Sequence, residues 1–325
     1  MVRRIRFAPL LLLALGLPYH AAAQQAYPAR PIRVVLPQAP GAGIDLVVRR
    51  MSDDLMPRLG QPLLVENRAG GNSVPGADAC AKAAPDGHTL CALNVDALAI
   101  NSFLFAKLPY DPVKDFRPIS SLFTILGGIL ARGSLPVNNI RELQALAVAK
   151  PGSLNVGTLG PNTINDLSRQ WLADHWKTSL ASIPYKGGPP ILAALAAGEI
   201  DMTYQGVYVA LGLAKANKVK VLAVSGTKRL PQFPDAPTLL EIGANDLPSA
   251  RAWWGVVTQS AVSDAIVRRL NTEIVRLYRE PAFLEFLASQ VTEGNAGTPE
   301  QFEAIIGDTR EKVGQLFKRY NIEKQ

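Results

Sequence analysis

The feature that most limits the possible folds is the alternation of strand-like and helix-like segments along most of the chain. Ile32–Leu36 is a β-branched run, and apolar residues then recur at helical spacing from Ile44 until Gly60. The pattern returns in the middle of the chain, where we expect a helix at 140–149 and a strand at 154–157. Such alternation is typical of α/β architecture.

Two amphipathic helices are expected to close the chain, after a strand at 254–257. The second helix opens with a capping box, in which Thr298 is the N-cap, Pro299 the first helical residue and Gln301 the third. In the first helix, four apolar residues share one face: Ile266, Leu270, Ile274 and Leu277.

The N-terminus has the layout of a secretory signal peptide. Arg3, Arg4 and Arg6 form a basic segment, an apolar run of about ten residues follows at 8–17, and small residues lead up to Ala23. A membrane anchor is the alternative, but the run is too short to cross about 30 Å of hydrocarbon. We therefore expect cleavage after Ala23 and export of the mature chain.

The length and charge of the mature chain limit its organisation and its partners. About 300 residues exceed the size at which one hydrophobic core stops growing, which favours two domains. The formal net charge of +7 falls to about +4 without the three arginines of the signal peptide. This mild excess is spread along the chain and weakly favours anionic partners. Nucleic acid is not expected, because its binding needs a concentrated basic stripe.

Cys80 and Cys91 are the only cysteines, and an even number in an exported chain predicts a disulfide. Two buried thiols are the alternative. A metal site that includes His88 would lack a fourth ligand, so no metal is expected.

The sequence contains no complete enzyme motif, and we predict no catalytic residues. An S-x-x-K pattern occurs at 225–228 without its companion elements, and the mature chain has only His88 and His175 for acid–base chemistry. The glycines at 41–43 suggest a dinucleotide fingerprint, but Leu46 stands where its third glycine belongs. No cofactor is therefore expected.

The loop between the first strand and the first helix can bind an anion. Gly41 and Gly43 lie between the strand and a helix that starts near Ile44. The first backbone N–H groups of a helix lack partners and carry the positive end of its dipole. An ordinary strand-to-helix turn uses the same glycines and is the alternative.

Several segments together point to a known family. In chain order they read PQAPGAGID at 37–45, VENR at 65–68, KAAPDG at 82–87, LPYDPVKDF at 108–116, PYKGG at 184–188, GEIDM at 198–202 and KRLPQFPDAPTLLEIG at 228–243. With these motifs the chain resembles the substrate-binding component of tripartite tricarboxylate transporters, the Bug family of periplasmic receptors. The likeness covers nearly the whole mature chain.

The resemblance implies an α/β, two-domain periplasmic-binding-protein fold of type II-like topology, with a ligand cleft between the domains. After a signal peptide at 1–23, domain 1 would be discontinuous and comprise 24–122 and 229–325. Domain 2 would comprise 123–228.

The resemblance also implies the ligand-binding residues, which lie in loops facing the cleft. Asp45 is expected to orient the helix start rather than to touch ligand, and Lys186 to be a cation at the edge of the cleft, not a catalyst. In domain 1 the implied residues are Ala39, Pro40, Gly41, Ala42, Gly43, Ile44, Asp45, Asn94 and Asp96. In domain 2 they are Thr158, Gly160, Asn162, Thr163, Tyr185, Lys186, Gly187 and Gln205.

The chain departs from the family pattern at five of its positions. Ala42 replaces a glycine, and Ile44 replaces a threonine, which removes one hydroxyl near the acid group of the ligand. Gln205 stands where aspartate is frequent, Asp166 where histidine is frequent and Asp96 where a neutral residue is common. We interpret Asp96 and Asp166 as solvated residues at the rim of the cleft.

The function implied by the resemblance is capture of a small organic anion, a carboxylate, in the periplasm. The receptor would be a monomer that delivers its ligand to integral membrane transporter subunits. A ligand sensor that feeds a signalling receptor is the alternative, and a secreted hydrolase is a remote one.

Overall fold

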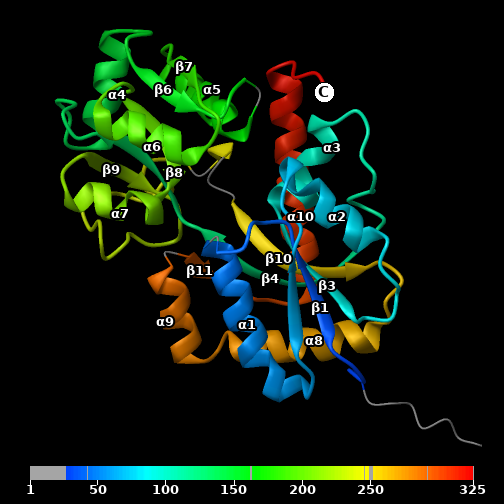
Figure 1. The fold of residues 1–325 in the computed structure, drawn as a ribbon. Helices are drawn as coiled ribbons and strands as arrows, with labels where there is room; N and C mark the ends of the chain where they lie inside the picture. The colour runs from blue at the N-terminus through cyan, green and yellow to red at the C-terminus, as the bar shows by residue number, and fades with distance from the viewer. Residues whose placement is uncertain are drawn as a thin grey trace, which may run out of the picture.

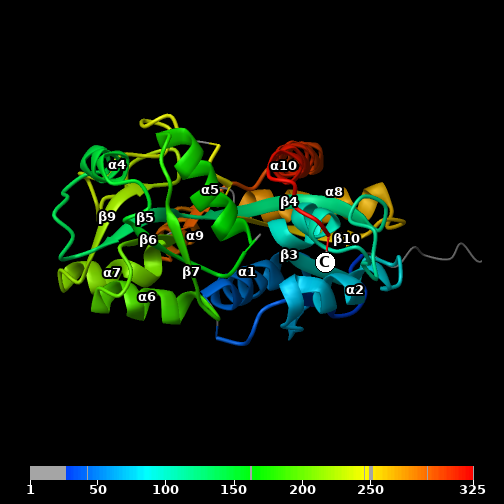
Figure 2. The ribbon, with the colours of Figure 1, turned by 90° about the horizontal axis from the view of Figure 1, so that it is seen from above.

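The computed structural model describes residues 27–41, 43–161, 163–244, 246–248, 252–290 and 292–324. The predicted signal peptide and its cleavage site after Ala23 lie outside the described residues. Two β-sheets organise the molecule, each with its own helices (Figure 1). Seen from above, the two sheets with their helices lie side by side, and the sheet from the middle of the chain is in green on the left (Figure 2).

The first sheet is built from both ends of the chain. Its strand order is β11-β4-β10-β3-β1-β2, with β1 parallel to β2 and β3, and β10 antiparallel to β3 and β4. The insertion of β10 between β3 and β4 ties the C-terminal part of the chain to the N-terminal part. The strands are β1 (Ile32–Leu36), β2 (Leu63–Asn67), β3 (Thr89–Asn94), β4 (Phe116–Ile125), β10 (Trp253–Gln259) and β11 (Thr292–Gly294).

Alternating apolar residues let helices cover both faces of this sheet. Val34 of β1 belongs to the core under α1, α8 and α9, whereas its neighbour Val35 belongs to the core under α2 and α10. The long helices are α1 (Gly43–Leu59), α8 (Asp264–Leu277), α9 (Pro281–Ser289) and α10 (Pro299–Arg319). The short ones are η1 (Gly71–Ser73), α2 (Val74–Ala81), the π-helix η2 (Asp96–Ile100) and α3 (Asn101–Leu104).

The second sheet comes from the middle of the chain and has the order β7-β6-β8-β5-β9. β6 is parallel to β7 and β8, while β5 is antiparallel to β8 and β9. Its strands are β5 (Gly127–Arg132), β6 (Asn155–Thr158), β7 (Ala181–Pro184), β8 (Met202–Gly206) and β9 (Val219–Val224). Its helices are α4 (Ile140–Ala149), α5 (Ile164–Trp176), α6 (Gly188–Ala197) and α7 (Val207–Lys215).

The chain crosses between the sheets at positions that differ from the expected boundaries. Strand β4 continues to Ile125 in the first sheet, so the first crossing lies at Leu126 rather than after residue 122. On the return, Leu239 and Leu247 are buried in the core formed by α4 and α5 of the second sheet. Packing therefore favours a second boundary after Leu247 instead of after residue 228, because the proline-rich segment closes the second core.

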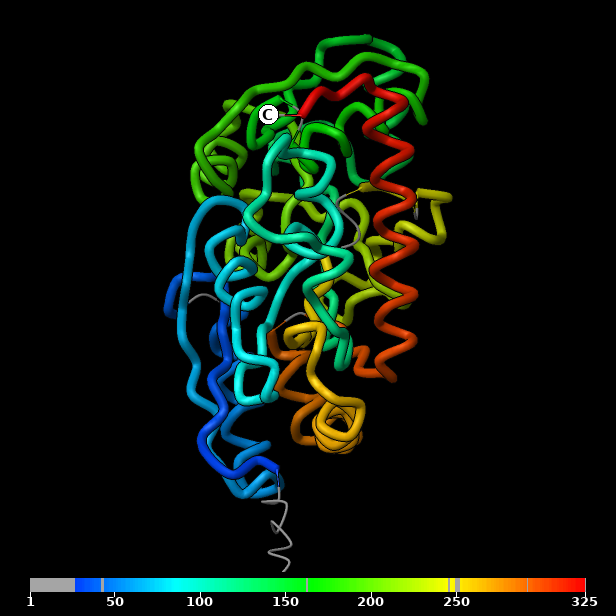
Figure 3. The backbone as a smooth tube through the Cα atoms, turned by 90° about the vertical axis from the view of Figure 1, so that its right-hand side faces the viewer, coloured from blue at the N-terminus to red at the C-terminus, as the bar shows by residue number. Residues whose placement is uncertain are grey.

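Helix α10 joins the two sets of elements (Figure 3). Its C-terminal end reaches α5, where Arg319 Nη2 and the Tyr320 hydroxyl lie 2.8 and 2.9 Å from Asp174 Oδ2. Val313 and Phe317 of α10 share an apolar cluster with Leu167 of α5. The C-terminal helix thus forms part of the wall between the sheets.

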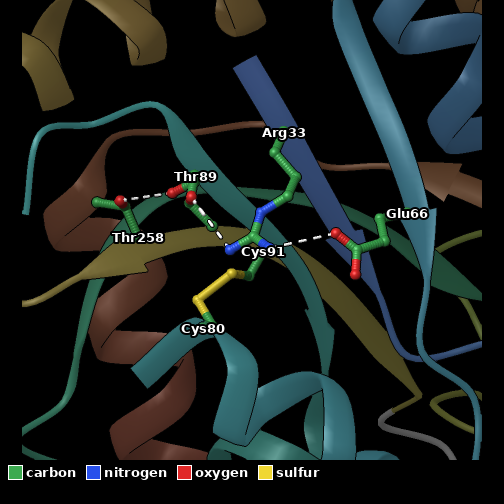
Figure 4. The surroundings of a disulfide bond; sticks show 6 residues. All are labelled: Arg33, Glu66, Cys80, Thr89, Cys91 and Thr258. Atoms are coloured by element: carbon green, nitrogen blue, oxygen red, sulfur yellow. Dashed lines mark hydrogen bonds and ion pairs between the residues drawn. A yellow bond between two sulfur atoms is a disulfide. The ribbon is translucent and has the colours of Figure 1, made fainter. Parts of the chain in front are cut away.

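The predicted disulfide is present and links the end of α2 to β3 (Figure 4). The Cα atoms of Cys80 and Cys91 are 6.1 Å apart, and both residues are buried. The predicted capping box at Thr298 is also confirmed. The expectation of two closing helices is wrong, because α9 lies between them with Phe283 and Leu287 buried against the first core. No helix among the described residues is long and apolar enough to cross a bilayer.

Candidate functional site

Two cavities lie between the sheets, and we call the one that contacts α10 the first cavity. It has a volume of about 200 Å³. From the first sheet and α10, its described lining residues include Val95, Asp96, Ile100, Thr309, Lys312, Val313 and Leu316. From the second sheet and the crossings they include Leu159, Ile164, Asn165, Tyr204, Gln205, Asp246 and Pro248.

The second cavity, of about 170 Å³, lies at the start of α1. None of its described lining residues is charged: they are Gln38, Ile44, Val47, Phe123, Ile125, Tyr208, Trp254, Gln290 and Thr292. Ile125 also lines the first cavity, so the two cavities meet at the end of β4.

Asp45 organises the loop between β1 and α1. The residue is 2% exposed. Its Oδ2 accepts hydrogen bonds from the Gly41 N–H at 3.0 Å and from Arg49 Nε at 2.9 Å. Its Oδ1 accepts a bond from Asn67 Nδ2 at 2.8 Å. Burial alone would raise the pKa of Asp45, but these bonds outweigh it and lower that pKa overall.

This network includes a residue that sequence reasoning did not select. Asn67 ends β2 and also donates to the Gln38 carbonyl at 3.0 Å, while its Oδ1 accepts a bond from Arg49 Nη2 at 2.9 Å. It therefore ties the loop between β1 and α1 to the neighbouring strand. Its position in the VENR segment at 65–68 was the available signal.

Asn94 ends β3, and Asp96 begins η2 and lines the first cavity. Asn94 Nδ2 donates to Asp96 Oδ2 at 2.8 Å, and Asn94 Oδ1 accepts from the Ala97 N–H at 3.2 Å. Desolvation raises the pKa of Asp96 to about 6, against the opposing effect of the Asn94 hydrogen bond. Asp96 therefore lies in the cavity wall and not on a solvated rim.

The interpretation of Asp166 as a solvated rim residue is wrong. The residue is 3% exposed, and its Oδ1 and Oδ2 accept hydrogen bonds from Arg169 Nε at 2.7 Å and Gln170 Nε2 at 3.0 Å. These partners come from the next turn of α5, so Asp166 stabilises that helix.

The loop after β6 uses its hydroxyl groups internally. Thr158 Oγ1 lies 2.9 Å from Ser182 Oγ and accepts the Gly160 N–H at 3.3 Å. Thr163 caps α5, accepting from the Asp166 N–H and donating to the Gly160 carbonyl at 2.8 Å. Gly160 has a φ of +108°, which favours glycine. The hydroxyl groups of Thr158 and Thr163 are therefore engaged within the protein rather than turned to a ligand.

The structure brings together only some of the residues that the sequence predicts. Asp96 and Gln205 line the first cavity, and Ile44 lines the second. Ala42 and Asn162 lie outside the described residues. The remaining predicted residues do not line either cavity: Ala39, Pro40, Gly41, Gly43, Asp45, Asn94, Thr158, Gly160, Thr163, Tyr185, Lys186 and Gly187.

Several cavity residues were not predicted, including Asn165, Tyr204 and Lys312. Asn165 is the second residue of α5, just after the predicted polar loop, so its place in the first turn of a helix was a usable signal. Lys312 lies in the middle of α10, far along the chain from every other motif, and its sequence pattern shows only an amphipathic helix.

Comparison with known proteins places these features in a family. Residues 47–322 match the family described as the tripartite tricarboxylate transporter family receptor. The UPF0065 protein in the tcbD-tcbE intergenic region of Pseudomonas sp. (strain P51) is 30% identical over 297 residues, covering 91% of this chain and 88% of that protein. Protein BugT of Bordetella pertussis is 29% identical over 283 residues, covering 87% and 86%.

Solved structures agree in fold. The periplasmic binding protein BugD is 28% identical with a TM-score of 0.73, over 92% of this chain and 100% of that chain. MatC from Rhodopseudomonas palustris with bound malate is 28% identical with a TM-score of 0.70, over 89% and 99%. The predicted two-domain α/β periplasmic-binding-protein fold is therefore confirmed.

Proposed function

Because the chain belongs to the family of tripartite tricarboxylate transporter receptors, we propose that it captures a small organic acid in the periplasm and delivers it to integral membrane transporter subunits. The mature protein begins after Ala23, binds its ligand as a monomer and has no catalytic activity. Ligand binds between the two sheets, where loops from both sheets and helix α10 meet.

The observation that carries the proposal is the pair of cavities at the ends of β3, β4 and β8. Clefts between two α/β domains are common ligand sites, and they are mostly apolar with a few polar groups. The malate in the related MatC supports a carboxylate as the class of ligand.

The acid group of the ligand binds at the start of α1, where Ile44 lines the second cavity. Backbone N–H groups at 43–45 belong to the first turn of α1 and so lack partners within the helix. The Gly41 N–H is not available, since it donates to Asp45. No charged side chain among the described lining residues repels an anion there, and the helix dipole attracts one.

A thermal-shift screen of mono-, di- and tricarboxylates tests whether the chain binds an organic acid. A ligand at 100 times its Kd stabilises the folded state by about 2.7 kcal/mol, which raises the melting temperature measurably. Calorimetric titration of each hit then gives its Kd. If no carboxylate shifts the melting temperature, the chain does not have this function.

The transport role has its own test in living cells. Deleting the gene for this chain should abolish uptake of the radiolabelled acid found in the screen, and restoring the gene should restore uptake. Normal uptake in the deletion strain, together with a changed transcriptional response to the acid, would indicate the sensor role instead.

A further inference from the structure

The charged residues of the first cavity do not suit a ligand that carries only acid groups. Asp96, Asp246 and Lys312 are the charged side chains among its described lining residues. Lys312 Nζ already lies 2.9 Å from Asp308 Oδ1 and 4.0 Å from Asp246 Oδ1. The one cation of this lining set is therefore neutralised by neighbouring acids, and none of the described cations forms an ion pair with Asp96.

Asp96 has an open hydrogen-bond acceptor at the cavity. Its Oδ2 accepts from Asn94, but no group among the described residues donates to its Oδ1. The nearby Tyr110 hydroxyl donates to the Ala97 carbonyl at 3.0 Å and so does not serve Asp96. With a pKa of about 6, raised by desolvation, the carboxyl group is mainly ionised at neutral pH. Asp96 is half-buried, and a carboxylate desolvated in this way is stabilised by a cation.

The opposite wall supplies a second open acceptor. Asn165, at the start of α5, is 7% exposed and lines the same cavity. Its Nδ2 donates to the Tyr204 carbonyl at 2.8 Å, which fixes the orientation of the amide. Its Oδ1 is buried without a hydrogen-bond donor among the described residues. Buried acceptors normally receive a hydrogen bond, so a ligand N–H group in the cleft can donate to this oxygen.

We propose that the ligand carries a protonated amine in addition to its acid group, and that Asp96 and Asn165 recognise the amine from opposite walls of the first cavity. The proposal rests on the proposed function and specifies its ligand class as amino-carboxylic acids. Asp96 comes from the first-sheet side and Asn165 from the second-sheet side, so an ammonium group would bridge both halves of the cleft.

Matched pairs of compounds that differ by one amine provide the test. Calorimetric titration at pH 7.5 compares succinate with aspartate and glutarate with glutamate. The amine-bearing member of at least one pair should bind about tenfold tighter or better, since a charge-assisted hydrogen bond contributes roughly that much.

The variant Asp96→Asn tests the residue itself. Its amide oxygen can keep the Asn94 bond, which turns an NH₂ donor toward the cavity in place of the open acceptor. The preference for the amine-bearing member should then fall about tenfold. Asp53→Asn removes the same charge from the exposed face of α1 and lines neither cavity, so it should leave the preference unchanged.

The outcomes separate a failure of the amine proposal from a failure of the proposed receptor function. If succinate and glutarate bind as tightly as their amine-bearing partners, the amine proposal is wrong while the receptor function stands. If Asp96→Asn lowers the affinity for both members of a pair equally, Asp96 does not bind the amine, and the proposal is likewise wrong. If no acid of either kind binds the wild-type protein, the proposed function fails and the amine proposal fails with it.

Discussion

The two cavities that meet at Ile125 differ in how they can recognise a ligand. The first has charged and amide side chains from both sheets, including Asp96 and Asn165. The second has no charged residue among its described lining residues and lies at the start of a helix. The first can therefore select a ligand by side-chain chemistry, whereas we propose that backbone N–H groups beside the second hold an anion.

The segments beside the two cavities also differ in how many hydrogen bonds hold them. Three hydrogen bonds to Asp45 hold the loop before α1, and Asn67 ties it to β2. Asp96, the first residue of η2 after β3, is held by one side-chain bond from Asn94. We infer that the anion site keeps its shape without ligand, while Asp96 adjusts more readily to the group that occupies its cavity.

The largest expected effect comes from a charge placed in the second cavity. Gln38→Glu changes shape little but adds an anion beside the start of α1. Repulsion at short range costs about 1 to 4 kcal/mol, so we expect the affinity for the acid ligand to fall by about 5- to 900-fold. Gln61→Glu makes the same change outside both cavities and should have almost no effect in the same titration. Equal losses in both variants would refute the anion site.

Breaking the network of the first loop should lower stability. Asp45→Asn cannot accept from Gly41, Arg49 and Asn67 together, because its NH₂ group would face a donor. We expect a loss of about 1 to 3 kcal/mol at pH 7, measured by denaturant unfolding. The folded-state pKa of Asp45 lies below 3.8, so its contribution is present above that pH. The contribution is lost only as the pH falls through the lowered folded-state pKa.

Asp96 should show the opposite dependence on pH. Its folded-state pKa of about 6 exceeds the usual 3.8, so the folded state binds the extra proton between these values and loses stability as the pH rises. Asp96→Asn should raise the free energy of unfolding at pH 7.5 by about 1 to 2 kcal/mol, and this gain should vanish near pH 4. Lys312 and Arg310 of α10 and Asp246 are the charged groups on neighbouring elements. A gain that is equal at both values of pH would contradict the desolvation of an ionised Asp96.

The smallest effect is expected at the edge of the cleft. Lys186 is exposed and lines neither cavity. Lys186→Met should weaken anion binding by no more than about threefold, because an exposed charge is screened by solvent and salt. A loss of affinity as large as that of Gln38→Glu would indicate that the acid group binds near the second sheet and not at α1.

The sequence predicted best what depends on neighbouring residues. The strand, glycine loop and helix around Gly41 form a local pattern, and β1 agrees with its prediction at both ends. Asp166 was misread because its burial depends on how α5 packs. The part of the wall formed by Lys312 was not predictable, since only the fold brings α10 to the cleft. Helix α9 was missed because it is short and buries few residues.

A crystal structure with the acid found by screening would locate its acid group. We predict that one carboxylate of the ligand lies within about 3 Å of backbone nitrogens at 43–45, at the start of α1. A carboxylate bound instead to Lys312, or to the loops at 158–163 and 185–187 of the second sheet, would contradict it.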